Sequence, residues 1–172
     1  MMEPVTTLDP RYSDPAAAPT PWAETRAALE AAELAWLVTL RPDGSPHATP
    51  VVPVWAEDGF HFTTRGVEQK GRNLRADNRV LLQVGRLDWQ DGLDIVVEGR
   101  ATLTTDPLVL GQLAAVWRER WDGRWAFEAS GDRLDHPGRF AVLTYSVHPR
   151  RVLAFAEGRF GHTLHRFPGD EA

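Results

Sequence analysis

Short strand-like segments joined by turns too short to hold a helix constrain the fold of this chain most. Apolar runs at 35–40, 45–55 and 60–64 are separated by the turn sequences RPDG and AEDG, as in antiparallel hairpins. Further strands are predicted at 79–85, 93–105, 139–147 and 150–156. Because no regular strand–helix alternation is present, the pattern favours a mainly β fold, a small barrel of six or seven antiparallel strands with flanking helices, over a doubly wound nucleotide-binding fold.

Three helices are predicted between these strands. Thr20 is expected to cap a first helix that has Pro21 at its first position, and Asp106 to cap another that begins at Pro107, because proline at that position loses no hydrogen bond. A short helix is expected over 68–75.

Two prolines interrupt the second strand. Pro50 and Pro53 each lack the N–H group that a neighbouring strand would bind. This part of the strand is therefore expected at a sheet edge, at a bulge, or where a bound ligand takes up the backbone groups.

The length of 172 residues fits a single domain. We expect a disordered N-terminal arm over 1–19, rich in Pro, Ala and acidic residues, one domain over 20–167 and a tail over 168–172. Cysteine is absent, which excludes disulfides and thiolate chemistry. Neither a signal peptide nor a membrane span is recognisable, and a cytoplasmic protein without membrane contacts is expected.

Lysine occurs only once, at Lys70, beside eighteen arginines. From Arg65 to Arg86 six cationic residues face two acidic ones, a local charge of +4 in a chain of net charge −5. A lysine is a compact point charge of the kind that binds phosphate, although an isolated loop lysine is more often simply solvated. The local charge favours an anion site, while the net charge disfavours nucleic-acid binding.

Two motifs indicate a family. They are K-x-R-N-L at 70–74 and D-x-V-V-E-G-x-A at 94–101, in order within a longer similar stretch of about 34–156. The chain resembles the split β-barrel, FMN-binding-like flavin and deazaflavin oxidoreductases, the superfamily that contains pyridoxamine 5'-phosphate oxidase, and is most similar to its branch that uses coenzyme F420.

This resemblance implies a homodimer with two cofactor clefts between the subunits and a small-molecule substrate. It makes Lys70 and Asn73 phosphate contacts, with hydroxyl groups from Thr63 and Thr64 nearby. Arg65 and Arg72 are further candidates. The backbone of Thr49, Pro50, Val51 and Val52 would run beside the ring system. The cofactor carries the hydride chemistry in such enzymes, so no catalytic side chain is indicated.

The resemblance leaves two cofactors open. F420 is preferred and FMN is the alternative, since both have a ring, a ribityl chain and a phosphate. Arg72, Arg75 and Arg79 would suit the longer acidic tail of F420, or form surface ion pairs of little energetic value. Pyridoxamine phosphate oxidation is disfavoured, because Gln83 replaces the lysine of the R-x-V-L-L-K motif and the C-terminal part departs from the substrate-phosphate arginine pattern of that enzyme. The C-terminal GHTLHRF also departs from the T-R-W-R-F-like pattern of the deazaflavin branch, so the resemblance does not define the contacts of this segment.

Several alternatives stay open beside hydride transfer. A non-catalytic split barrel could bind a flavin, haem or another tetrapyrrole. His47 and His61 could take part at the cleft or be ordinary sheet residues, and His162 and His165 are not predicted to bind a metal. Tryptophans could stack on a ring or pack in the core; these are Trp89, Trp117, Trp121 and Trp125. Asp94 and Glu98 are not read as an acid–base pair. The substrate is unreadable because it depends on the loops at 86–93 and 122–138.

Overall fold

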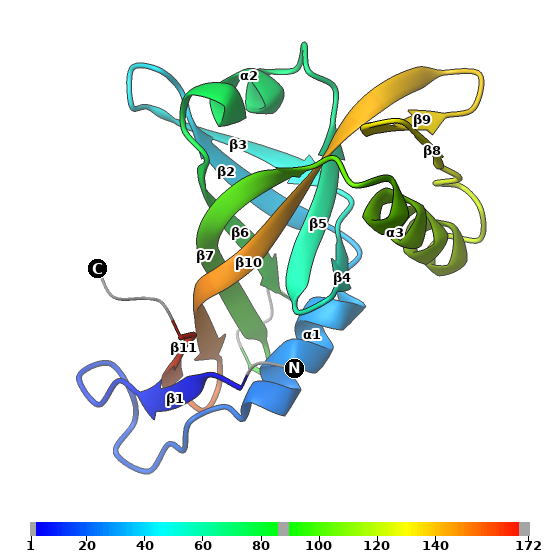
Figure 1. The fold of residues 1–172 in the computed structure, drawn as a ribbon. Coiled ribbons are helices and arrows are strands. Elements are labelled where there is room, and N and C mark those ends of the chain that lie inside the picture. Colours follow the sequence, from blue (N-terminus) through cyan, green and yellow to red (C-terminus); the bar gives the residue numbers. More distant parts are fainter. Residues whose placement is uncertain (1–2, 86–89, 169–172) are drawn as a thin grey trace.

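The computed structural model describes residues 3–85 and 90–168, which contain three helices and eleven strands (Figure 1). The helices are α1 (Trp22–Ala31), α2 (Gln69–Ala76) and α3 (Pro107–Arg120). The strands are β1 (Val5–Leu8), β2 (Ala35–Leu40), β3 (Pro46–Val51), β4 (Val54–Ala56), β5 (Gly59–Thr64), β6 (Arg79–Gly85), β7 (Leu93–Thr104), β8 (Glu128–Ser130), β9 (Arg133–His136), β10 (Phe140–Ala156) and β11 (Gly161–Arg166). The predicted mainly β fold is confirmed.

One long strand, β10, organises the sheet and crosses the middle of the molecule in Figure 1. It pairs with β7 over most of its length, with β5 along its first half and with β11 along its second half, always antiparallel. The sheet then continues through β6 and β2 to β3. Two strands were predicted at 139–147 and 150–156, but they form this single strand, because the irregularity at Pro149 shifts the register without ending it.

The strand count of six or seven is therefore corrected. The additional elements are β1, β11 and the β8–β9 hairpin, which pairs with the start of β10. The segment predicted as one strand over 45–55 forms two strands, β3 and β4. Within the described residues the sheet has open ends at β1 and β3, so this chain does not close it into a complete barrel.

The two larger helices cover separate hydrophobic cores. Trp22 and Leu29 of α1 are buried with Leu37 and Phe60 of the sheet, whereas Trp117 of α3 is buried in a second cluster with residues of β9 and β10. Such burial is the main stabilising contribution of each helix. None of the helices in the described ranges combines the length and apolar character needed to cross a bilayer.

The starts of these helices confirm one predicted cap and correct the other. Asp106 caps α3 as predicted, because its carboxylate accepts a hydrogen bond from the N–H of Leu108 at 2.8 Å. Thr20 does not cap α1, which begins at Trp22 without a side-chain cap. Its N–H group instead donates to the hydroxyl of Thr163 at 2.8 Å, so Thr20 fastens the chain to β11.

The expectation of a disordered arm over 1–19 is corrected by β1. This strand pairs antiparallel with β11, and the Thr6 hydroxyl lies 2.9 Å from Nδ1 of the fully buried His165. The other ring nitrogen of His165 lies 2.9 Å from the Thr25 hydroxyl on α1. Composition missed this strand because its partner is more than a hundred residues away in the sequence. The predicted tail lies outside the described residues except for Pro168.

The expected place of the proline-containing strand is confirmed. Pro50 lies in β3, which pairs with β2 and is at the end of the sheet order, and Pro53 lies in the turn before β4. The carbonyl of Val52 in the same turn accepts a hydrogen bond from the indole N–H of Trp117 at 3.2 Å. This bond joins the sheet edge to α3.

Candidate functional site

A cavity of about 410 Å³ lies where the sheet edge, the start of α2 and the α3 side of the molecule meet. Its volume is in the range of small-molecule sites. The lining residues are Leu34, Pro50, Val51, Val52, Thr63, Thr64, Arg65, Glu68, Lys70, Trp117, Trp125, Phe140 and Val142. Seven of the predicted cofactor-binding residues are therefore brought together: Pro50, Val51, Val52, Thr63, Thr64, Arg65 and Lys70.

One carboxylate oxygen in this cavity accepts three hydrogen bonds. Oε2 of Glu68 accepts from Lys70 Nζ at 2.6 Å, from the Thr64 hydroxyl at 2.8 Å and from the backbone N–H of Arg65 at 3.2 Å. An ammonium, a hydroxyl and a backbone N–H are the donor types that bind phosphate. The Glu68 carboxylate thus stands where an anionic oxygen of a ligand would be expected.

Close packing between the loop and α2 fixes these donors. A side chain on Gly71 would place its Cβ 2.6 Å from the carbonyl oxygen of Arg65, so the helix can approach the loop only because residue 71 is glycine. The Glu68 carbonyl accepts from the N–H of Arg72 at 3.0 Å, and the Glu68 N–H donates to the Arg65 carbonyl at 3.0 Å. Packing and backbone hydrogen bonds therefore fix the segment that carries these donors.

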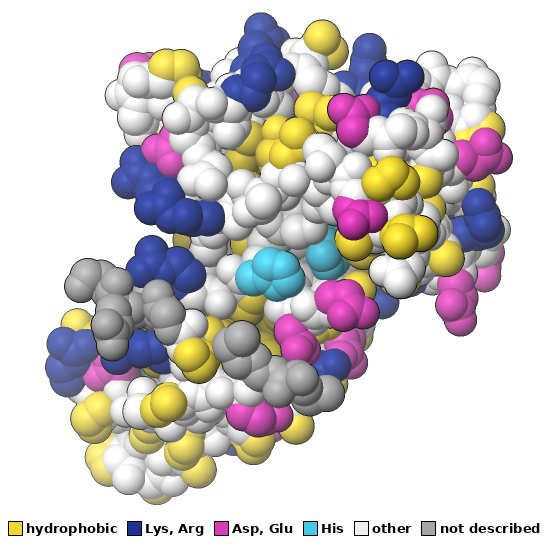
Figure 2. Space-filling view, viewed as in Figure 1, with side chains coloured by type: hydrophobic (Ala, Val, Ile, Leu, Met, Phe, Trp, Pro, Cys, Tyr) yellow, Lys and Arg dark blue, Asp and Glu magenta, His cyan; other side chains and the backbone are white. Residues whose placement is uncertain are grey.

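The two charged side chains of this contact, Lys70 and Glu68, differ in their exposure to solvent. The Lys70 side chain is 14% exposed, whereas that of Glu68 is 39% exposed. Partial burial raises the pKa of the Glu68 carboxyl, but hydrogen bonds from Lys70 and Thr64 outweigh it, so the pKa is lowered overall. In Figure 2, Lys and Arg side chains lie mainly along the upper and left edges of the face shown, with some Asp and Glu side chains among them. Other Asp and Glu side chains lie over the centre and right of this face.

Aromatic and aliphatic side chains form much of the remaining cavity lining. Trp117 packs edge-on against Phe127 with 5.6 Å between the ring centroids, and Trp125 and Phe140 lie beside it in the lining. The Arg65 guanidinium lies 5.8 Å from the centroid of the Phe140 ring, within reach of a cation–π contact. A flat ligand with an apolar ring and an anionic end fits this division of the cavity.

Three predicted contacts do not line the cavity: Thr49, Arg72 and Asn73. Asn73 is fully buried. Its amide donates to the Thr39 hydroxyl at 2.9 Å and accepts from Gln69 at 2.8 Å. The bond to Thr39 holds α2 against β2, and the bond from Gln69 lies within α2. The geometry therefore gives Asn73 a packing role and no support for the predicted phosphate contact.

Sequence reasoning missed Glu68, Leu34, Phe140 and Val142 as cavity residues. The alternation of Phe140 and Val142 on one face of a predicted strand was the available signal for these two. Glu68 carried a weaker signal, an acid two positions before the only lysine.

His61 takes a structural position in the sheet. Burial lowers the pKa of His61 to about 4; its Nε2–H donates to the Ala56 carbonyl at 2.9 Å and its Nδ1 lies 2.8 Å from the Ser146 hydroxyl. His162 and His165 lie three positions apart on β11 and so point to opposite faces of the strand. No group of three His, Asp or Glu side chains close enough to hold a metal occurs in 3–85 and 90–168. Arg86 and Trp89 lie outside the described residues.

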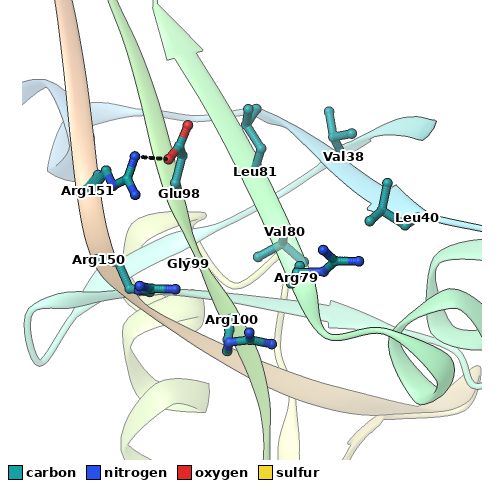
Figure 3. Close-up of a pocket in the computed structure, with 10 residues that line it drawn as sticks. All are labelled: Val38, Leu40, Arg79, Val80, Leu81, Glu98, Gly99, Arg100, Arg150 and Arg151. Atoms are coloured by element: carbon teal, nitrogen blue, oxygen red, sulfur yellow. Dashed lines mark ion pairs between the residues drawn. The ribbon is translucent and has the colours of Figure 1, made fainter. Parts of the chain in front are cut away.

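A second cavity, of about 310 Å³, carries more cations (Figure 3). It is lined by Val38, Leu40, Arg79, Val80, Leu81, Glu98, Gly99, Arg100, Arg150 and Arg151. Arg79 is paired with Asp77, Arg100 donates to Asn78 at 3.0 Å, and Arg151 lies 4.0 Å from Glu98. These three contacts run to different acceptors, in contrast to the shared oxygen of Glu68.

Comparisons with known proteins agree with this fold. The family model described as pyridoxamine 5'-phosphate oxidase matches residues 21–154. Similar solved structures include a conserved hypothetical protein from Mycobacterium tuberculosis, with 20% identity and a TM-score of 0.66 over 81% of this chain and 86% of that one. The haem storage protein HutZ from Vibrio cholerae has 14% identity and a TM-score of 0.61, covering 79% and 96%.

A protein described as an F420 reductase has 23% identity and a TM-score of 0.54, covering 74% of this chain and 94% of that one. Identities this low show a shared fold and not a shared ligand. No curated protein matches the sequence significantly.

Proposed function

Because the chain belongs to the pyridoxamine 5'-phosphate oxidase family, we propose that it is an oxidoreductase that transfers a hydride between coenzyme F420 and a small organic molecule. The supporting observation is the convergence of Lys70, Thr64 and the Arg65 N–H on one anionic oxygen beside an aromatic wall. FMN is the alternative cofactor, since it has the same phosphate and a ring of similar shape.

The residues of the cavity have distinct roles in this proposal. Lys70, Thr64 and the Arg65 N–H bind the phosphate, and Trp117 and Trp125 line the ring site and exclude water from it. The bound cofactor supplies the hydride chemistry at its ring. Because the indole of Trp117 is bonded to the Val52 carbonyl at 3.2 Å, the sheet edge and the aromatic wall keep a fixed separation.

The preference for F420 rests on the branch of the family that the sequence resembles. An F420 reductase among the similar folds is compatible with it. Arg75 and Arg79 give less support than expected, because Arg75 donates to the Gly66 carbonyl at 2.9 Å and Arg79 is paired with Asp77. Phosphate recognition by Lys70 is the same for both cofactors.

The proposal includes a homodimer whose second protomer completes the site. Leu34, which lines the cavity, is 61% exposed, and Trp36 on the neighbouring strand is 54% exposed. Large apolar side chains that stay exposed next to a ligand cavity are typical of a surface that another protein covers. Sedimentation equilibrium of the wild type and of Trp36→Glu tests this part, with dissociation expected for the variant.

Titration with FMN and with F420 tests the cofactor proposal. We expect Lys70→Ala to weaken binding of the preferred cofactor about 30-fold, on the order of 2 kcal/mol, because a charge-assisted contact is lost. Arg100→Ala is the matched control from the other cavity. Equal affinity before and after the Lys70 change would contradict the phosphate site. Reoxidation of reduced cofactor by a quinone-like acceptor tests hydride transfer, and absorbance changes with haem alone would favour a non-catalytic tetrapyrrole-binding protein.

A further inference from the structure

The proposed phosphate site already contains an anion that belongs to the chain. We infer that the carboxylate of Glu68 competes with the ligand's phosphate for the same donors, so that cofactor binding requires its displacement and Glu68 sets the preference for phosphorylated over unphosphorylated ligands. This inference rests on the proposed function. It assigns to Glu68 a role that the sequence did not predict.

The contacts of one atom carry the inference. All three donors reach Oε2 of Glu68, at 2.6, 2.8 and 3.2 Å. The Lys70 ammonium and the Thr64 hydroxyl cannot keep these bonds and also bind a phosphate oxygen at the same point. A phosphate must therefore replace the carboxylate or bind in a weaker arrangement beside it.

Charge makes coexistence unfavourable. With Glu68 in place, the carboxylate neutralises the Lys70 ammonium at 2.6 Å, so an arriving phosphate meets a locally neutral pair and the repulsion of a nearby carboxylate. With Glu68 displaced, the phosphate meets an uncompensated ammonium in a partly desolvated cavity, where charge interactions are stronger than in water. Displacement is thus the arrangement that the electrostatics favour.

The backbone permits this displacement. The N–H and C=O groups of Glu68 are bonded to Arg65 and Arg72, each at 3.0 Å, and its side chain makes no capping bond to the first turn of α2. Rotation of the side chain therefore leaves the helix start intact. Because this side chain is already 39% exposed, solvent can receive the carboxylate without opening the fold.

The ratio of two dissociation constants tests the inference. FMN and riboflavin differ only by the phosphate, so the ratio of riboflavin Kd to FMN Kd isolates recognition of that group. Glu68→Gln keeps the shape but removes the charge, and we expect it to raise this ratio about tenfold, which corresponds to about 1.4 kcal/mol. Lys70→Ala should lower the ratio. Glu98→Gln, in the arginine cavity, is the matched control and should leave it unchanged. An unchanged or lower ratio in Glu68→Gln would overturn the inference.

Inorganic phosphate separates this inference from the proposed cofactor. We expect phosphate to raise the melting temperature of Glu68→Gln more than that of the wild type, compared with chloride at equal ionic strength, and the difference to disappear in Glu68→Gln/Lys70→Ala. If this difference is present but no flavin or deazaflavin binds any variant, the cofactor assignment fails and the competition by Glu68 stands. If phosphate raises the melting temperatures of the wild type and of Glu68→Gln equally, Glu68 does not compete with phosphate for the anion site.

Discussion

The two cavities of this protein differ in how their cations are held. Four arginines line the cavity of Figure 3. Arg79, Arg100 and Arg151 contact different residues, and the Arg79 side chain is 62% exposed. The Lys70 cavity has fewer cations, yet its ammonium is largely enclosed and shares one acceptor oxygen with a hydroxyl and a backbone N–H. Convergence of enclosed donors, more than the number of cations, therefore distinguishes a candidate anion site.

Exposure explains why the arginine cavity is the weaker candidate. Hydrogen bonds from Arg79 lower the pKa of Asp77 to about 2. This carboxylate therefore stays ionised, and remains paired with the Arg79 guanidinium, at any pH well above that value. Exposed pairs of this kind contribute little to stability. An incoming anion would have to compete with them in full contact with water, whereas in the Lys70 cavity it competes with a single displaceable carboxylate.

The largest expected effect is a loss of stability on acidification, caused by polar groups that are enclosed in the fold. Burial lowers the pKa of both His61 and His165 to about 4, against about 6.5 in the unfolded chain. The unfolded state then binds more protons, so their stabilisation is complete above pH 6.5 and is lost as the pH falls towards 4. We expect the free energy of unfolding to fall by a few kcal/mol over this interval, as measured by urea denaturation.

Variants identify the groups responsible for this pH dependence. His61→Gln and His165→Gln should each flatten the dependence between pH 6.5 and 4. A slope that survives in the double variant would assign the effect to other groups.

Asn73→Ala sharpens the comparison at the border of the Lys70 cavity. Removal of the amide leaves the Thr39 hydroxyl and the Gln69 amide without their partner, which should cost about 2 kcal/mol of unfolding free energy. Cofactor affinity of the folded protein should change less than twofold. Gln69→Ala, which removes one of the two bonds, should destabilise less. A loss of affinity as large as that of Lys70→Ala would instead make Asn73 a ligand contact.

Arg100→Ala should have the smallest effect. This side chain is exposed and donates to Asn78 at 3.0 Å, so we expect a change in unfolding free energy of at most about 0.5 kcal/mol. Cofactor affinity measured by titration should change less than twofold. A large loss of affinity would break the comparison, because it would bring the arginine cavity into the cofactor site.

Local sequence signals predicted the regular elements well where they were strong. The strands at 35–40 and 79–85 and the Asp106 cap of α3 match the structure, because apolar runs, turns and caps act over a few residues. Long-range pairing was not predictable in the same way. Val5–Leu8 forms a strand only against β11. The strands predicted at 139–147 and 150–156 form one strand because β7 pairs with residues on both sides of Pro149.

The candidate site shows the same division. The resemblance selected the segments that line the cavity, and seven of its ten proposed residues do so. It could not show that Asn73 faces Thr39 inside the fold, since side-chain direction depends on how α2 is packed against β2.

The sequence by itself determined the mainly β class, the family and the concentration of positive charge around Lys70, because composition, periodicity and short motifs are properties of neighbouring residues. Only the tertiary structure decided which donors meet. It placed Thr64, Arg65 and Lys70 around the Glu68 carboxylate. In the other cavity it gave Arg79, Arg100 and Arg151 separate partners. Hydrogen bonds form between groups brought together by packing, and that arrangement is fixed by the whole sheet rather than by any one segment.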